Sequence, residues 1–145
     1  MSATTIRFPA DIPEGKVRLA CYEEVAGISF RIENAVAFAK GRNHRLELER
    51  EPGNAHDPNA IKVLGVYKGW VFEHRVHIGY VPADLASLIA ERGIFGQIEA
   101  YLRNIWHGGY AKDSVHVNFD IFQPEPPEVE KPKRKRAKKG PSAEA

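Results

Sequence analysis

The sequence has a single cysteine, Cys21, among its 145 residues. One thiol cannot form an internal disulfide, which excludes a cross-linked fold and favours a reducing compartment. No apolar run approaches the roughly 18–20 residues of a membrane-spanning helix. The stretch from Met1 to Arg7 also lacks the apolar segment of a secretory signal. These absences predict a cytoplasmic or nucleoid-associated protein with no membrane partner.

The common sequence motifs of catalysis and phosphate binding are also missing. There is no Gly-x-Ser-x-Gly motif, no Gly-x-x-x-x-Gly-Lys-Ser/Thr loop and no Gly-x-Gly-x-x-Gly turn. Asp57 next to His56 or Glu51 would be a weak acid/base pair, because neighbours on one backbone rarely converge on a substrate. We therefore expect no enzyme activity, no catalytic residue and no cofactor.

Histidine occurs six times, but not in a metal-binding pattern. His74 and His77 are three residues apart on an expected strand, where their side chains would face opposite sides. No cysteine pair accompanies them, whereas structural zinc sites usually combine closely spaced cysteines and histidines. The sequence therefore predicts no metal site.

Charge is distributed unevenly along the chain. Residues 1–123 carry 14 Lys and Arg against 15 Asp and Glu, whereas residues 124–145 carry 7 against 4. A nearly neutral body argues against a protein that coats a duplex by bulk charge. It still allows a small binding site for one nucleic-acid strand or for the end of one.

Composition divides the chain into three segments. Residues 1–15, interrupted by prolines and a glycine, predict a flexible N-terminal arm, and residues 16–122 predict one folded domain. Residues 123–145 are rich in proline and lysine and have no apolar period, which predicts a disordered basic tail. That tail is either a solubilising end or a non-specific phosphate tether, whose attraction salt would screen.

Most of the body alternates apolar and polar residues, which is typical of antiparallel strands with one buried and one solvent-exposed face. The alternation runs through residues 16–21, 45–49, 61–63, 98–103 and 115–121. Residues 82–93 instead show helical spacing between Pro82 and Gly93, and residues 35–40 fit a short helix or a loop. The expected fold is mainly β, a small OB-like or SH3-like β-barrel of five to seven strands with one or two short helices.

The most informative segment is the loop that follows the strand expected at residues 45–49. It contains Asn54, Asp57 and Asn59. Side chains of Asn and Asp hydrogen-bond to nearby backbone groups, and both residues tolerate unusual dihedral angles. These residues either only tie the loop together, which we favour for Asn59, or contact a ligand. Pro58 pushes Asp57 toward an extended conformation, so that its carboxylate is available to a hydroxyl donor.

Two sequence blocks resemble the HIRAN domain family. The first, from Leu46 to Val63, reads Leu-x-Leu-x-Arg-Glu-Pro-x-Asn-x-His-Asp-x-Asn-Ala-Ile-x-Val. The second, from His77 to Ala86, reads His-Ile-Gly-Tyr-Val-Pro-x-x-Leu-Ala. A strand ending at residues 25–30 fits the first element of the family. The first block is a specific signal because its elements must coincide in register, and the resemblance covers nearly the whole body.

The resemblance implies an OB-like module that binds the 3′ end of single-stranded DNA, in DNA repair or replication-fork processing. A pocket would hold the terminal hydroxyl, with Asp57 accepting its hydrogen bond. Asn54 would shape the same loop and reach the sugar or a phosphate, His56 would stack or donate, and Phe30 would stack on a base. Tyr80 would face the phosphate or the sugar, unless it is only a half-buried tyrosine of the barrel.

Two positions depart from the family pattern, and both lose a cation. Ser29 stands where an arginine often grips the DNA backbone, and Ala83 stands where a lysine does so. Fewer cations should weaken phosphate binding and flatten its salt dependence. Arg31 and Lys112 are candidate replacements for DNA binding, and Tyr110 in the Gly-Gly turn is a further stacking candidate.

Two other functions stay open on the sequence alone. The domain would be a protein-interaction barrel that has lost its DNA groove, or an accessory subunit whose helicase or nuclease partner supplies the activity. Neither the ATPase nor the RING segment to which family members are often fused accompanies the body. A monomer is the default oligomeric state.

Overall fold

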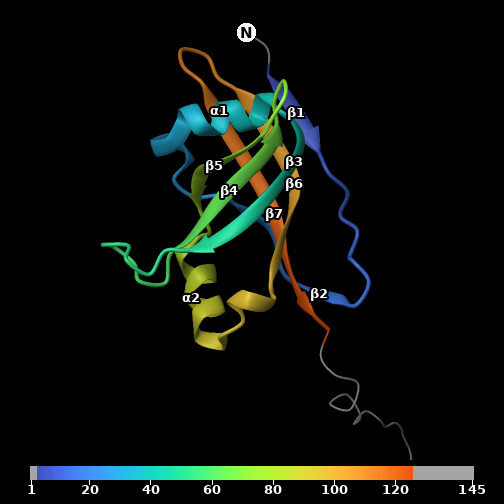
Figure 1. The fold of residues 1–145 in the computed structure, drawn as a ribbon, viewed down its shortest axis with the longest axis vertical. Coiled ribbons are helices and arrows are strands. Elements are labelled where there is room, and N and C mark those ends of the chain that lie inside the picture. The colour runs from blue at the N-terminus through green and yellow to red at the C-terminus, as the bar shows by residue number, and fades with distance from the viewer. Residues whose placement is uncertain (1–2, 126–145) are drawn as a thin grey trace, which may run out of the picture.

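The structure is a computed structural model that describes residues 3–125. This part of the chain holds seven strands, two α-helices and two short 3-10 helices (Figure 1). In chain order they are β1 (Thr4–Arg7), β2 (Lys16–Glu24), η1 (Ile28–Arg31), α1 (Ile32–Lys40), β3 (Arg42–Arg50), β4 (Ile61–Lys68), β5 (Glu73–Tyr80), α2 (Ala83–Arg92), η2 (Phe95–Gln97), β6 (Glu99–Gly108) and β7 (Ser114–Pro124). Most of the predicted tail, from residue 126 onward, lies outside the described residues, and Gln123 and Pro124 complete β7.

The strands form two antiparallel sheets, one in the order β1-β6-β7-β2 and one in the order β3-β4-β5. This arrangement confirms the prediction of a mainly β fold, for which five to seven strands and one or two short helices were expected. β3 and β6 lie close to each other without pairing, so hydrogen bonds do not close a barrel within residues 3–125. A cavity of about 720 Å³ occupies this seam and contains none of the predicted site residues. The OB-like or SH3-like barrel therefore stays a prediction.

The local sequence determines helix α2 more clearly than helix α1. Helix α2 begins after Pro82 and ends at Arg92, and Gly93 takes the left-handed conformation with φ 64° that terminates helices. Helix α1 covers the ambiguous residues 35–40, which are helical rather than a loop. Figure 1 shows α1 near one end of the molecule and α2 near the other. No helix within residues 3–125 is long and apolar enough to cross a membrane.

Part of the predicted flexible arm is a strand. Residues Thr4–Arg7 pair with β6 in an antiparallel ladder. The backbone N–H of Phe8 then donates to the carbonyl of Arg103 at 3.0 Å. Ile6 and Phe8 pack against the core, and this burial explains why the segment is an edge strand instead of a loose arm.

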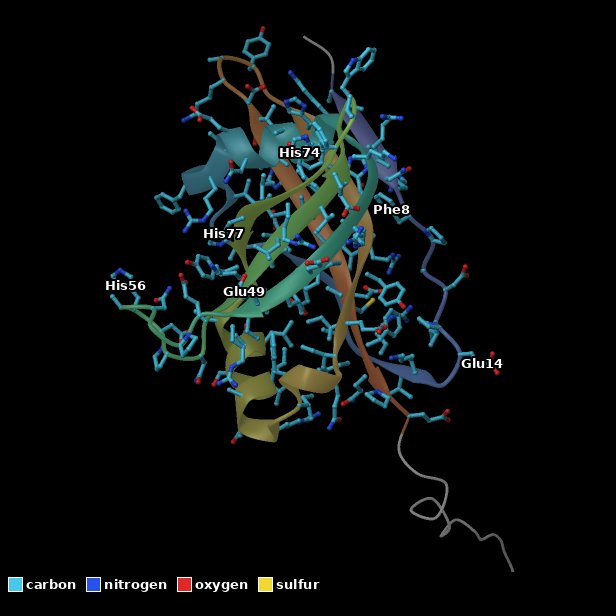
Figure 2. All side chains as sticks on the ribbon, in the orientation of Figure 1. Phe8, Glu14, Glu49, His56, His74 and His77 are labelled. Carbon is cyan, nitrogen blue, oxygen red and sulfur yellow. The ribbon has the colours of Figure 1, made fainter. Side chains whose placement is uncertain are left out.

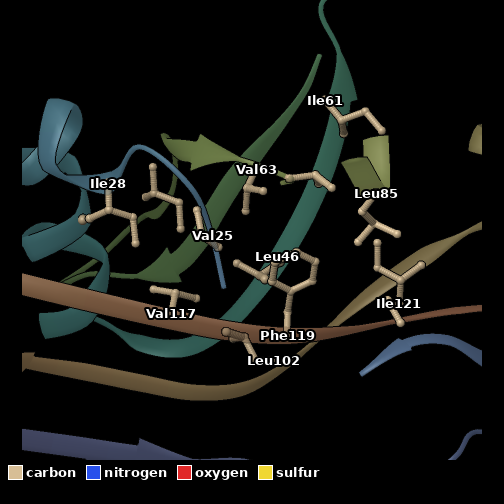
Figure 3. Packing of buried hydrophobic residues seen from close by; sticks show 14 of the residues in the cluster. Val25, Ile28, Leu46, Ile61, Val63, Leu85, Leu102, Val117, Phe119 and Ile121 are labelled. Carbon is tan, nitrogen blue, oxygen red and sulfur yellow. The ribbon is translucent and has the colours of Figure 1, made fainter. Parts of the chain in front are cut away.

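The core lies between the two sheets, where the labelled side chains of both point toward one another (Figure 3). β7 contributes Val115, Val117, Phe119 and Ile121, and β4 contributes Val63 from the opposite side; all are buried. These are the apolar residues of the alternating pattern, as predicted. Burying one such side chain stabilises the fold by about 1.5–3 kcal/mol, which determines the face that each strand turns inward.

Asp120 departs from the alternation. The pattern predicts that its side chain is exposed to solvent, whereas the residue is only 1% exposed. One of its carboxylate oxygens accepts hydrogen bonds from Arg18 Nε at 3.2 Å and Arg103 Nη1 at 3.1 Å. The other accepts the backbone N–H of Tyr22 at 2.7 Å. Tyr22 has a φ of 53° beside a bulge in β2, so the carboxylate stabilises an otherwise strained backbone.

We expect Asp120→Ala to lower the free energy of unfolding by about 3 kcal/mol, since it leaves two arginines and a backbone N–H without their acceptor. Urea denaturation measures this loss. The matched control Glu24→Gln removes an exposed pair with His116 (2.7 Å), and it should cost less than about 1 kcal/mol. Equal losses in the two variants would contradict the assigned role of Asp120.

Candidate functional site

The segment after β2 is attached to the end of β5. Ala26 and Tyr80 exchange two backbone hydrogen bonds, each of 2.8 Å. Gly27, with a φ of 76°, then turns the chain into η1. The strand predicted to end at residues 25–30 therefore ends earlier, and Phe30 lies on a 3-10 turn that shares a cavity with Tyr80.

Gly79 allows this attachment. A Cβ atom at this position would overlap the carbonyl oxygen of Ala26 and lie 2.6 Å from Val25 Cγ1. Only a residue without a side chain lets the backbone of β5 come this close to the incoming segment. The glycine of the second sequence block is therefore required by the geometry of the site.

The loop between β3 and β4 is closed by its own hydrogen bonds. The backbone N–H of Glu51 donates to the carbonyl of Ala60 at 2.9 Å. The side-chain oxygen of Asn54 accepts the backbone N–H groups of His56 at 2.8 Å and Asp57 at 2.9 Å. Its amide nitrogen donates to Glu51 Oε1 at 3.0 Å. Asn54 is thus mainly a residue that shapes the loop.

Asp57 retains one carboxylate oxygen for a ligand. Its Oδ1 accepts the backbone N–H of Asn59 at 2.9 Å, so Asn59 ties the loop through its backbone. The second oxygen, Oδ2, makes no hydrogen bond to any residue between 3 and 125. The side chain is half-buried and lines a cavity. This oxygen can accept a hydrogen bond from a ligand hydroxyl.

Four polar side chains are linked beside the same cavity. The Tyr80 hydroxyl donates to Glu51 Oε1 at 2.7 Å and accepts from Arg31 Nη2 at 3.4 Å. The Arg31 guanidinium lies over the Tyr80 ring, 5.6 Å from its centroid. His77 Nε2 lies 3.3 Å from Arg31 Nε and 2.8 Å from the Gly79 carbonyl oxygen, and its tautomer decides which contact is a hydrogen bond.

Hydrogen bonds and burial set the charges of this network. Hydrogen bonds from Asn54 and Tyr80 hold the pKa of Glu51 below its usual value. Burial, followed by the nearby charge of Arg31, lowers the pKa of His77. At neutral pH Glu51 is therefore ionised and His77 neutral. Neither residue was predicted from the sequence as a binding residue, although Glu51 belongs to the Arg-Glu-Pro element and His77 opens the second block.

These elements surround a cavity of about 520 Å³, which we call the terminal cavity. It brings together six of the predicted binding residues, namely Asp57, Asn54, His56, Phe30, Tyr80 and Arg31. Phe30 is 86% exposed, and Figure 2 shows His56 at the outer end of the loop. Ala83 also lines the cavity, and Arg31 is the one Lys or Arg on its wall within the described part of the chain.

Tyr110 lies apart from the terminal cavity. It borders a groove of about 610 Å³ between η1 and the turn that joins β6 to β7, which we call the second groove. Tyr110 is 95% exposed, and Lys112 and Ser29 line the same groove. Gly27 borders both the groove and the terminal cavity, so the two hollows adjoin across the start of η1.

Fold and site together define a small β-rich binding module, with exposed aromatic rings, a guanidinium and a carboxylate at an open cavity. The HIRAN domain model matches residues 20–107. That match covers more than half of the 145 residues, and the chain belongs to the HIRAN domain family. HIRAN domains are nucleic-acid-binding modules. No curated protein and no solved structure matches the chain.

The close backbone contact at Gly79 generates a stability prediction. Gly79→Ala should lower the free energy of unfolding by about 1–3 kcal/mol, because the new methyl group must displace the Ala26 carbonyl or break the bridge. Gly53→Ala is the control in the neighbouring loop, where nothing lies within 4 Å of the added Cβ. Urea midpoints compare the two, and an undiminished midpoint for Gly79→Ala would show that the bridge is not required.

The lowered pKa of Glu51 generates a pH prediction. Because this pKa is depressed in the folded state, the contribution of the carboxylate is present above its usual value of 4.5 and is lost as pH falls through the lowered pKa. NMR signals of the Asn54 amide and the Tyr80 ring should titrate together with a midpoint below 4.5. Glu51→Gln should abolish that titration, whereas Glu49→Gln, two residues earlier near the end of β3, should leave it. A midpoint above 4.5 would refute the network.

Proposed function

We propose that the chain binds single-stranded DNA and holds a 3′-hydroxyl end in the terminal cavity. The observation that supports this most directly is that Asp57 lines the cavity and its Oδ2 accepts no hydrogen bond from residues 3–125. A 3′-hydroxyl donates to a carboxylate, and a hydrogen bond to a charged group contributes about 1.5–3 kcal/mol. A 3′-phosphate brings negative charge against the carboxylate and is disfavoured.

The other cavity residues have chemistry suited to the last nucleotide. Phe30 presents an exposed ring, and base stacking on such a ring contributes about 1–3 kcal/mol. The Tyr80 hydroxyl and the Arg31 guanidinium are adjacent polar groups that suit a sugar or a phosphate. His56 is exposed at the loop end for stacking or donation, and Asn54 holds the loop in shape.

The second groove supports a path for the nucleotide that precedes the end. Tyr110 would stack on its base, and Lys112 would contact its phosphate. Arg31 and Lys112 are the only Lys or Arg that line either hollow in the described part of the chain, and Ser29 and Ala83 add none. We therefore expect a shallow dependence of affinity on salt.

We also propose a setting for this activity. Free 3′ ends arise in DNA repair and at replication forks, so the module would act in the cytoplasm, on the nucleoid. An OB-like barrel would carry the binding surface, and a helicase or nuclease partner would supply the catalysis. The family membership supports the nucleic-acid part of this proposal.

Fluorescence anisotropy with labelled oligonucleotides that end in a 3′-hydroxyl or a 3′-phosphate tests the proposal. The unchanged chain should prefer the hydroxyl by about tenfold or more, as expected for one hydrogen bond to a charge. Asp57→Asn keeps an oxygen for the Asn59 N–H but removes the charge, and it should bring the two affinities within about threefold.

Asp84→Asn is the matched control, since Asp84 is exposed on the neighbouring helix and bonds only the adjacent Leu85 N–H. It should keep the full preference for the hydroxyl. Deleting residues 126–145 should lower affinity for both ends alike. Equal binding of both ends by the unchanged chain would refute end recognition, and absent binding of either would favour a protein-interaction module.

A further inference from the structure

The turn between β4 and β5 presents three consecutive apolar residues to solvent. Trp70 is 94% exposed, Val71 64% and Phe72 72%. Contiguous exposed apolar side chains on a folded domain usually mark a contact surface. We call these residues the hairpin tip; none of them lines the terminal cavity or the second groove.

The hairpin tip is held in place by its surroundings. The backbone N–H of Gly69 donates to the carbonyl of Phe72 at 2.9 Å and closes the turn. Arg42 Nη2 donates to the Gly69 carbonyl at 2.6 Å. Just below, the rings of Tyr67 and His74 stack with centroids 5.1 Å apart. A partner would therefore meet side chains on an ordered turn, which lowers the entropy cost of contact.

The charge beside the hairpin tip is positive. Arg42 and Lys68 are exposed there and face each other across the ladder of β3 and β4, and Lys40 is exposed next to Gly41, which lies against Tyr67. None of the three cations makes an ion pair with another residue between 3 and 125. The nearest carboxylate along the chain, Glu73, is paired with Arg45 at 2.8 Å. Aromatic rings beside unpaired cations suit bases and phosphates of a single strand.

We propose that the hairpin tip is a second base-stacking site for single-stranded nucleic acid. Figure 1 shows this hairpin end opposite the loop that precedes β4. β5 runs over 8 residues from the tip to Tyr80, which is about 26 Å at roughly 3.3 Å per residue. A strand held at its 3′ end must therefore be several nucleotides long before it reaches Trp70. The inference rests on the proposed nucleic-acid binding, but not on recognition of the 3′-hydroxyl.

Intrinsic fluorescence reports on this site directly, because the only two tryptophans of the chain are Trp70 and Trp106. In a Trp106→Phe variant, Trp70 is the sole emitter. An oligothymidylate of about 16 nucleotides, the upper site size of single-strand modules, should quench its emission on binding. A short oligothymidylate that ends before the tip should bind without quenching.

Anisotropy on the otherwise unchanged chain gives a second measurement that does not require the Trp106 variant to fold. Trp70→Ala should weaken binding of the long oligothymidylate at least about fivefold, the lower bound for one lost stacking contact. It should leave binding of the short one unchanged. Trp70→Phe keeps a ring and should retain the affinity within about twofold. Val71→Ala, which removes no ring, is the matched control on the same turn.

Trp70 emission that stays constant while the long oligothymidylate saturates the protein would overturn the proposal. So would emission that responds only to anionic phospholipid vesicles, or only to protein concentration, since these would indicate a membrane or a second copy as the partner. The hydroxyl preference of the Asp57→Asn comparison is measured separately. Loss of the hydroxyl preference with Trp70 quenching intact would refute end recognition alone. A retained hydroxyl preference without Trp70 quenching would refute the hairpin tip alone.

Discussion

The site depends on the paired backbone hydrogen bonds between Ala26 and Tyr80, which exist because Gly79 has no side chain. This bridge brings η1, from the first quarter of the chain, to the end of β5. Tyr80 in turn reaches the loop before β4 through its bond to Glu51. Three segments that are distant in sequence therefore meet in one fixed arrangement. The terminal cavity is a consequence of backbone pairing rather than of an adaptable loop, which suits recognition of one small chemical group.

The distribution of charge fits a module that recognises a strand by contact rather than by bulk attraction. On the three-stranded sheet, Glu47 pairs with Arg75 at 2.7 Å and with Arg45 at 3.1 Å, and Arg75 together with Arg45 lowers the pKa of Glu47. That face is self-neutralised and offers little to phosphates. Among the described cations that form no ion pair, Arg31 borders the terminal cavity, Lys112 borders the second groove, and Lys40, Arg42 and Lys68 lie near the hairpin tip. Binding would then rely mainly on base stacking, and few counterions would be released from the phosphates.

Local pattern predicted much of the fold, because strand alternation and helix punctuation are properties of neighbouring residues. It predicted the buried face of β7, helix α2 with its Gly93 terminus and the loop of Asn54 and Asp57. Local pattern did not predict features that depend on residues far apart in the sequence. Asp120 is buried because arginines from two other strands reach it. β2 ends early because Ala26 pairs with Tyr80 of β5 and Gly27 then turns the chain into η1. Glu51 is linked to Tyr80, and His77 lies against Arg31, and no sequence period indicates either of these distant partners.

The order of strands in the four-stranded sheet has a consequence for the nascent chain. β1 and β2 lie at its two edges, whereas β6 and β7, their pairing partners, follow every strand of the other sheet in the sequence. During translation the early strands leave the ribosome with unpaired backbone groups, while β3, β4 and β5 can already pair as consecutive hairpins. The first strands remain open to wrong pairing until synthesis passes β7. The three-stranded sheet can therefore pair before the four-stranded sheet, whose edge strands must wait for β6 and β7.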